Sequence, residues 1–316
     1  MNRIPTVLFT YNRPDLLRQT LESLSANTLA GETDLIVYAD GPKENATADQ
    51  LEKIQQVRSV IREKKWCKSI TVYEAEKNKG LARSVIEGVT ATLQKSELVI
   101  VLEDDVLLSP FFLQYMNDAL TIYKDEPTVF AIGAWTYFTR RNFNHRPFFM
   151  RYPDSIAWGT FKRSWEKFEY DPQKIKQRLI TENKLSRFNG FNNLKYFEPM
   201  LDLFIQGKID SWAIRWTATS ILENGLTLFP PVSMVKHMGF DQAGTHERME
   251  DYNVDLPLAN EIAVVEKQEV IESVSAFTDW KNFILNRFLH SDSRKVKLMN
   301  RLKESLPRFI FNLLFA

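Results

Sequence analysis

The strongest constraint on the fold is a regular alternation of apolar, β-branched runs with amphipathic helical patterns through the first hundred residues. The expected strands cover residues 6–10, 34–39, 69–73 and 98–102, and the expected helices begin at Pro14 and cover 48–65 and 81–93. The fourth strand is apolar throughout, as expected for a central strand covered on both faces. This alternation predicts βαβ units and an α/β fold with a mostly parallel sheet flanked by helices.

In an open parallel sheet, ligands bind in the crevice beyond the carboxyl ends of the strands. Polar and charged residues follow all four expected strands. They are Tyr11-Asn12-Arg13, Asp40-Gly41, Glu76-Lys77-Asn78 and Glu103-Asp104-Asp105. The fold therefore predicts that these four segments meet at one edge of the sheet and form a binding site there.

Three neighbouring carboxylates, Glu103, Asp104 and Asp105, follow the buried fourth strand directly. They repel one another, and burial near a sheet edge is costly unless a positive group lies beside them. Hard oxygen ligands at an open site suit Mg²⁺ or Mn²⁺, with a phosphate-bearing substrate completing the coordination. The alternative is a solvated acidic turn in which Asp105 caps a following helix.

The same segments carry a family resemblance. The strand followed by Glu103-Asp104-Asp105 resembles the DxD-type motif of GT-A glycosyltransferases, in the form found in the N-acetylglucosaminyltransferase I group. Thr10-Tyr11-Asn12-Arg13-Pro14 resembles the opening of family 2 glycosyltransferases, Asp40-Gly41 resembles their strand-two acid, and residues 78–83 resemble their Asn-x-Gly-x-x-x-Arg-type segment. The four motifs occur in the family's order and cover roughly the first 110 residues.

The resemblance implies a GT-A fold and a nucleotide-sugar donor site. Its donor-binding residues would be Thr10, Tyr11, Arg13, Asp40, Asn78, Arg83, Glu103 and Asp104, and Asp105 would bind the metal. Purely structural roles remain open for some of these residues. The two arginines could form surface salt bridges, and Asp40 could simply make an Asp-Gly turn.

An inverting transfer needs a general base within hydrogen-bond reach of the acceptor hydroxyl. The carboxylate candidates are Asp154, Asp202, Asp210 and Asp241. We favour Asp210, because Asp210-Ser211-Trp212 loosely resembles the segment that carries the base in N-acetylglucosaminyltransferase I-like enzymes. The alternative is that Asp210 is the N-cap of the helix that follows.

Two further features of the second half suggest substrate contacts. Trp158, before Gly159 in an aromatic-rich stretch, could stack on an acceptor or donor sugar, although such stretches are more often core. The loop with His237 and His246 resembles a family 2-like loop that closes over the donor. We expect His246 to reach the metal or the diphosphate, since neutral imidazole is a common ligand. His237 could instead donate to the backbone and hold the loop.

No low-complexity linker separates the halves. We expect one catalytic domain, with residues 1–125 as its nucleotide-sugar-binding half and 126–260 as its acceptor-binding, catalytic half. Residues 261–316 should form a helical, basic tail. Its basic and apolar side chains suit an interfacial helix on an anionic membrane, and docking on the core or on a second subunit is equally compatible.

These observations predict an inverting, metal-dependent hexosyl- or N-acetylhexosaminyltransferase that uses a UDP-sugar and a carbohydrate or lipid-linked acceptor. A formal net charge of +1 indicates no nucleic-acid partner. Missing signal-peptide features and the absence of a roughly 20-residue apolar stretch suggest a cytoplasmic protein, peripheral on the inner membrane face at most. The alternatives are a sugar-phosphate nucleotidylyltransferase, disfavoured because no glycine precedes Gly31, and a non-catalytic nucleotide-sugar-binding protein.

Overall fold

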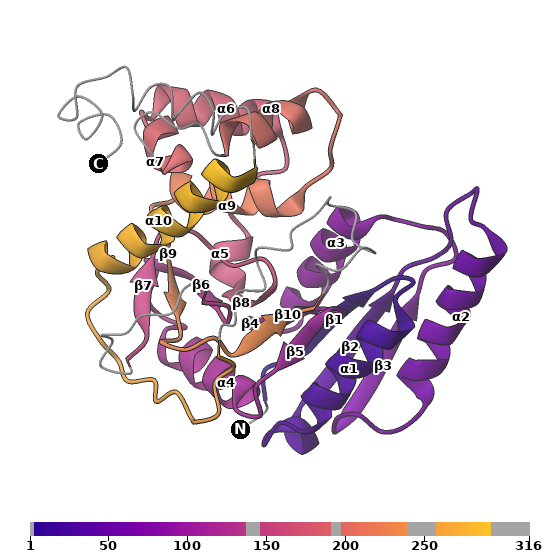
Figure 1. The fold of residues 1–316 in the computed structure, drawn as a ribbon. Coiled ribbons are helices and arrows are strands. Elements are labelled where there is room, and N and C mark those ends of the chain that lie inside the picture. Colours follow the sequence, from indigo (N-terminus) through magenta and orange to yellow (C-terminus); the bar gives the residue numbers. More distant parts are fainter. Residues whose placement is uncertain (1–2, 137–145, 191–196, 239–256, 292–316) are drawn as a thin grey trace.

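An eight-stranded mixed sheet forms the centre of the molecule, and its strand order is β3-β2-β1-β4-β8-β6-β9-β7. The computed structural model describes residues 3–136, 146–190, 197–238 and 257–291 (Figure 1). The strands are β1 Thr6–Thr10, β2 Asp34–Ala39, β3 Ser69–Glu74, β4 Leu98–Glu103, β6 Val129–Gly133, β7 Phe148–Met150, β8 Ala157–Phe161 and β9 Leu226–Phe229. β5 (Val106–Leu108) and β10 (Val235–His237) form a separate antiparallel pair.

The first half folds as its periodicity predicts. β1, β2, β3 and β4 pair in parallel, and α1 (Pro14–Ser25), α2 (Ala48–Arg62) and α3 (Leu81–Leu93) connect them. The expected α/β fold with a largely parallel sheet flanked by helices is confirmed. α2 ends before the predicted residue 65, because Trp66 Nε1 donates to the carbonyls of Val60 and Ile61 and satisfies the end of the helix.

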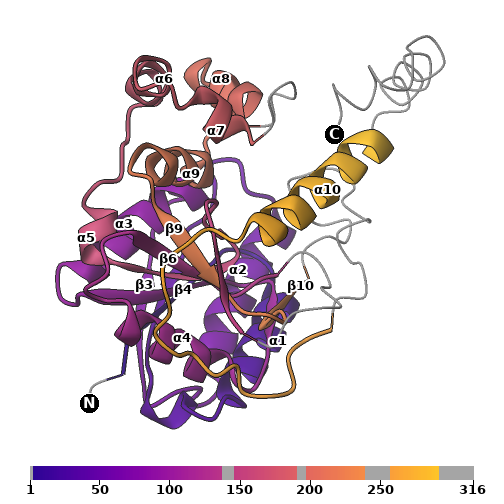
Figure 2. The ribbon, with the colours of Figure 1, turned by 90° about the vertical axis from the view of Figure 1, so that its left-hand side faces the viewer.

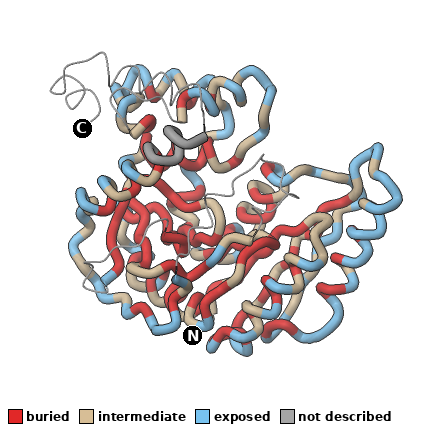
Figure 3. Tube along the Cα trace, viewed as in Figure 1, coloured by how far each residue is buried: buried red, intermediate tan, exposed pale blue. Residues whose placement is uncertain are grey.

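Alternate residues of β1 point into two different apolar layers, as a strand buried on both faces requires. Leu8 packs in the core cluster that includes residues of α1, α2 and α4 (Phe112–Ile122). Val7 and Phe9 pack in the cluster that includes residues of α3. In Figure 3 most buried residues lie in the centre of the molecule and most exposed residues lie on its outer faces. β1 is thus packed between two apolar layers, and helix residues contribute to both of them.

The second half extends the same sheet. β8 pairs antiparallel with β4 and β6, so the parallel pattern is broken beyond β4. Residues on both sides of position 125, such as Leu8 and Phe149, share one apolar cluster. Both halves therefore contribute to one core.

A helical layer stands over the second half of the sheet. It consists of α6 (Pro172–Thr181), α7 (Leu185–Asn189) and α8 (Glu198–Ile205), which contact α9 (Trp212–Leu222), with α10 (Val274–Ser291) alongside (Figure 2). α10 buries Ala276, Trp280 and Ile284 in the apolar cluster of this layer. The start of the predicted tail is therefore docked on the rest of the chain, which is one of the two arrangements that the sequence left open. The basic stretch from 292 to 316 lies outside the described residues. None of the helices in the described ranges is long and apolar enough to cross a bilayer.

Candidate functional site

The acidic triplet lies at the carboxyl end of β4. Glu103 is the last residue of the strand, and Asp104 and Asp105 form the turn into β5. Asp104 is 1% exposed and Asp105 is 3% exposed. The alternative of a solvated acidic turn is therefore wrong. Asp105 is also not a helix cap, because a strand follows it.

The end of β1 supplies the groups that contact this triplet. Asp104 Oδ2 accepts hydrogen bonds from Thr10 Oγ1 at 2.7 Å and from the Tyr11 backbone N–H at 3.3 Å. The Arg13 guanidinium bridges both aspartates, with Nη2 on Asp104 Oδ1 and Nη1 at 2.7 Å from Asp105 Oδ2. The parallel sheet brings these segments together because β1 and β4 are neighbours and end at the same edge.

Burial dominates the electrostatics of the cluster. Burial raises the pKa of Glu103 well above its usual range and raises that of Asp104, and in both cases the other carboxylates add to the effect while Arg13 opposes it. For Arg13, burial lowers the pKa, but the carboxylates of Asp104, Asp105 and Glu103 more than offset this, so its pKa lies above the usual range. Because burial and the neighbouring carboxylates both disfavour the ionised forms, a further cation beside the triplet would stabilise the carboxylates and lower these pKa values.

Two buried oxygens at the site have no hydrogen-bond partner among the described residues, Asp105 Oδ1 and Tyr11 Oη. A buried polar atom of this kind is costly unless a ligand satisfies it. Asp105 Oδ1 and the neighbouring carboxylates are hard oxygen donors that fit Mg²⁺ or Mn²⁺. Within the described ranges, no group of three or more His, Cys, Asp or Glu side chains is already arranged to hold a metal ion. The two aspartates are engaged by Arg13 instead.

His237 is the histidine that the structure brings to the cluster. The antiparallel pairing of β10 with β5 sets His237 opposite Val106, and its Nε2 lies 3.5 Å from Asp105 Oδ2. The Met238 backbone N–H donates to the Asp105 carbonyl at 2.7 Å and fixes this approach. His246, the predicted metal ligand, lies outside the described residues. The sequence left open whether His237 holds its loop or lies at the site, because the strand pairing that sets it beside Asp105 has no local signal.

Asp40 has a different surrounding from the one expected. Its carboxylate accepts four hydrogen bonds, from the backbone N–H groups of Gly41 (2.8 Å), Lys79 (2.8 Å) and Gly80 (3.0 Å) and from Asn78 Nδ2 (2.9 Å). A carboxylate has about four acceptor positions, so this one is filled. In this structure Asp40 and Asn78 fasten the loop after β3 to the end of β2, and neither the Asp40 oxygens nor this amide group is left for a nucleotide.

Close packing explains why glycine follows Asp40. A Cβ on Gly41 would lie 2.6 Å from the backbone of Lys77, closer than any side chain tolerates. The Asp-Gly pair is therefore part of a tight contact between two loops, which a turn alone does not require.

Arg83 and Asp210 line one open cleft of about 540 Å³ between α3 and the start of α9. The cleft's other lining residues are Ile86, Glu87, Thr90, Ala91, Gln94, Tyr170 and Arg215. Arg83 is exposed and pairs with Glu87 at 2.6 Å, as the salt-bridge alternative expected. The structure thus joins two predicted site residues from opposite halves of the chain.

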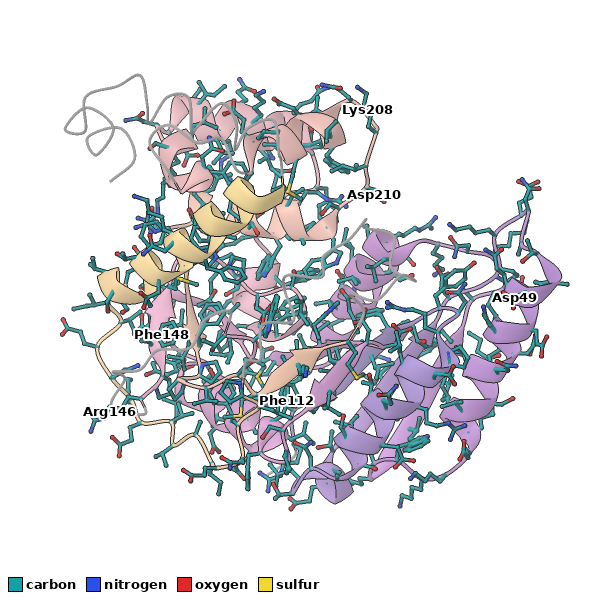
Figure 4. The ribbon with its side chains drawn as sticks, viewed as in Figure 1. Asp49, Phe112, Arg146, Phe148, Lys208 and Asp210 are labelled. Carbon is teal, nitrogen blue, oxygen red and sulfur yellow. The ribbon has the colours of Figure 1, made fainter. Side chains whose placement is uncertain are left out.

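Asp210 lies just before α9 (Figure 4). Its Oδ1 is 3.1 Å from Arg215 Nη2, and its side chain is 65% exposed. The N-cap of α9 is Ser211, whose Oγ accepts from the Ile214 N–H. The alternative that Asp210 caps this helix is therefore wrong, and its carboxylate is left facing the cleft.

The other candidate bases are placed less suitably. Asp154 is fully buried, and its two oxygens accept four backbone N–H bonds, from Ala134, Trp135, Ser155 and Ile156. Asp202 pairs with Lys176, and Asp241 lies outside the described residues. Among the candidate bases that the structure describes, Asp210 is the one whose side chain is 65% exposed and lines the cleft between α3 and α9.

Trp158 belongs to the core in this structure. It is 1% exposed and stacks on Trp212 at 5.1 Å, with Trp165 and Trp216 also within 6 Å. The neighbouring Gly159 allows the close approach of Leu120 and Met116 from α4. The predicted stacking of Trp158 on a sugar has no exposed ring face to use here, because β8 lies inside the sheet.

Comparison with known proteins identifies one family. The model of the family described as glycosyl transferase family 2 matches residues 6–201. No curated protein sequence matches the chain.

Several solved structures share features of the fold. They include the mannosyltransferase PcManGT from Pyrobaculum calidifontis in complex with GDP-Man and Mn²⁺, with 13% identity, 69% of this chain and 73% of that chain covered, and a TM-score of 0.36. S. aureus TarS in complex with UDP-GlcNAc is 13% identical, with 79% of this chain and 63% of that chain covered, and a TM-score of 0.39. At such TM-scores these likenesses carry no weight for substrate or mechanism.

Proposed function

The chain belongs to glycosyl transferase family 2, and from that premise we propose that it is an inverting enzyme that transfers a sugar from a UDP-sugar to a carbohydrate or lipid-linked acceptor. A divalent cation, Mn²⁺ or Mg²⁺, would assist. The observation that carries the proposal is the buried triplet at the end of β4, in contact with Thr10, Tyr11 and Arg13 from the end of β1. The finer likeness to N-acetylglucosaminyltransferase I stays a prediction.

The donor would bind at this edge of the sheet. Asp105, whose Oδ1 has no partner among the described residues, would hold the cation as the sequence predicts. We add Asp104, which the sequence assigns to the donor, as a second ligand, because Arg13 bridges its carboxylate to that of Asp105. The cation would neutralise the diphosphate as it leaves. Tyr11 offers a buried hydroxyl with no partner in the described structure, which suits a hydrogen bond to the donor. Arg13 offers a planar fork of donors that matches phosphate oxygens.

The acceptor would occupy the cleft between α3 and α9. Asp210 faces this cleft, and we assign it the general base that takes the proton of the attacking hydroxyl on its carboxylate. Arg215, itself only 8% exposed, would orient that carboxylate through its ion pair with Asp210. The half-exposed Tyr170 ring at the same cleft offers an apolar face for a sugar.

Family membership and the side chains at the strand ends bear on the two other functions. A nucleotidylyltransferase needs a glycine-rich loop after its first strand, where this chain has Tyr11-Asn12-Arg13-Pro14. A binding module without catalysis could hold a cation on the same carboxylates of Asp104 and Asp105, so release of the sugar in the assay below is what separates it from an enzyme.

A thermal-shift panel tests the proposal. UDP-, GDP-, CMP- and dTDP-sugars are each added with and without Mn²⁺, and sugar release is followed in parallel. We expect a UDP-sugar with Mn²⁺ to raise the melting temperature most, since a ligand that binds only the folded state stabilises it. Asp105→Ala should remove the dependence of that shift on Mn²⁺, whereas Asp49→Ala, an exposed acid on α2, should not. An unchanged shift in Asp105→Ala would reject Asp105 as a ligand.

A further inference from the structure

Arg13 sits between buried carboxylates and solvent. Its side chain is 27% exposed, whereas those of Asp104 and Asp105 are 2% and 5% exposed. Its backbone is fixed, because it directly precedes Pro14 at the start of α1 and its carbonyl accepts from the Leu17 N–H at 3.0 Å. The guanidinium therefore reaches solvent on one side and the two aspartates on the other, from a backbone that the start of α1 holds in place.

The guanidinium and a divalent cation need the same atoms. Arg13 uses Asp104 Oδ1 and Asp105 Oδ2, so the only oxygen of Asp105 that it leaves unpartnered among the described residues is Oδ1. A doubly charged ion on these carboxylates would also repel a guanidinium at contact distance, and this repulsion is strong in a buried site. The cation can coordinate both aspartates only if Arg13 withdraws.

A withdrawn Arg13 needs another anion. The diphosphate of the proposed donor would lie beside the cation, and arginine binds phosphate oxygens with two parallel N–H bonds. Because the Arg13 side chain is partly exposed and lies between β1 and α1, the exchange we infer needs a rotation of this side chain and no change in either element.

We propose that Arg13 is an exchangeable counter-ion, which holds Asp104 and Asp105 while no cation is bound and passes to the diphosphate when the cation binds. The inference rests on the proposed function. It makes Arg13 a positioning residue with two effects. Arg13 weakens binding of the metal alone, and it makes metal and nucleotide bind cooperatively, so that the cation site fills together with the donor.

The test measures Mn²⁺ binding by electron paramagnetic resonance, with and without UDP, for wild type, Arg13→Gln, Arg13→Lys and Arg18→Gln. Arg18 lies within α1, five residues after Arg13, and its side chain is 43% exposed and pairs with Glu63, so its variant is the matched control. Thermal melting without ligands checks the folding of each variant.

In the wild type, UDP should tighten Mn²⁺ binding about tenfold or more, a coupling within the range found for linked sites. Arg13→Gln should bind Mn²⁺ alone about tenfold more tightly than wild type, and its coupling to UDP should fall below about threefold. Arg18→Gln should match wild type. Arg13→Lys keeps the charge, so it should fold even if Arg13→Gln does not, and should lose part of the coupling, because an ammonium cannot bridge two carboxylates or grip a diphosphate with two bonds.

The failures are distinguishable. If the wild type binds Mn²⁺ and UDP cooperatively, and Arg13→Gln and Arg13→Lys keep its affinity and coupling, the exchange is wrong and the proposed function stands. Weaker Mn²⁺ binding by Arg13→Gln than by wild type also overturns the exchange, because it would mean that Arg13 supports the metal. If no variant binds Mn²⁺, with or without UDP, the metal assignment itself fails and the inference with it.

Discussion

We expect the Asp40→Ala variant to be less stable to unfolding than the wild type, even when no nucleotide is present. The carboxylate is 8% exposed and accepts hydrogen bonds from Gly41, Asn78, Lys79 and Gly80, which tie the end of β2 to the loop that begins α3. Asp40→Ala leaves all four donors without this acceptor. A donor buried without an acceptor destabilises the folded state.

The size of the effect follows from these contacts. A hydrogen bond to a charged group contributes about 1.5–3 kcal/mol, but the four share one acceptor and the loop can open to water, so their contributions do not add fully. We expect Asp40→Ala to lower the free energy of unfolding by about 3 kcal/mol, in line with other losses of a buried hydrogen-bond network. For a chain of this length that corresponds to a fall of about 6 °C in melting temperature.

Calorimetry or circular dichroism on the nucleotide-free protein measures this shift. Asp49→Ala is the control, because that acid is exposed on α2 and pairs only with Lys53 among the described residues, and it should change the melting temperature by no more than about 1 °C. If Asp40→Ala melts within that margin of wild type while donor binding is lost, Asp40 is a nucleotide ligand and the loop-fastening role is wrong.

Asp210→Asn should lower kcat about 100-fold or more with an unchanged donor Kd, because the variant keeps the shape but cannot accept the proton. Steady-state kinetics with calorimetric donor binding checks this, and wild-type kcat would exclude Asp210 as the base. Burial raises the pKa of Asp154 to about 6 despite four backbone N–H donors, so the folded chain keeps a proton that the unfolded chain loses near pH 4. The stability that protonated Asp154 contributes is therefore present below about pH 4 and is lost as the pH rises through about 6. In denaturant titrations, the free energy of unfolding of the wild type should fall over this range by about 3 kcal/mol relative to that of Asp154→Asn. If the free energy of unfolding changes with pH in the same way for the wild type and Asp154→Asn, this role of Asp154 is wrong.

Local patterns were sufficient for the four strands and three helices that precede Asp104, but β5 and α4, which follow it, were not predicted. The apolar run before Glu103 and the leucines after Pro14 repeat at the spacing of a buried strand and an amphipathic helix, and both elements form where expected. The end of α2 was missed, because it depends on Trp66, a side chain outside the periodic pattern. The antiparallel β8 was also missed, since its pairing with β4 joins segments far apart in sequence.

For the site, the sequence predicted where the polar groups meet but not which hydrogen-bond or ion-pair partner each of them has. The rule for parallel sheets brought Thr10, Tyr11 and Arg13 to the acidic triplet. It could not show that hydrogen-bond donors from the loop after β3 would occupy the acceptor positions of the Asp40 carboxylate. The donors are the Asn78 side-chain amide and the backbone N–H groups of Lys79 and Gly80, and of these only the Asn78 amide is visible in the sequence.

What the sequence determined by itself is the α/β alternation, the edge of the sheet that carries the acids, and the family, because periodicity and motif order are properties of contiguous residues. Tertiary structure alone decided that Trp158 is core, that His237 reaches Asp105, that Asp210 faces a cleft with Arg83, and that Arg13 bridges the acids. The physical reason is that burial and charge pairing depend on segments that meet only after folding, and each carboxylate binds the donors it then finds within reach.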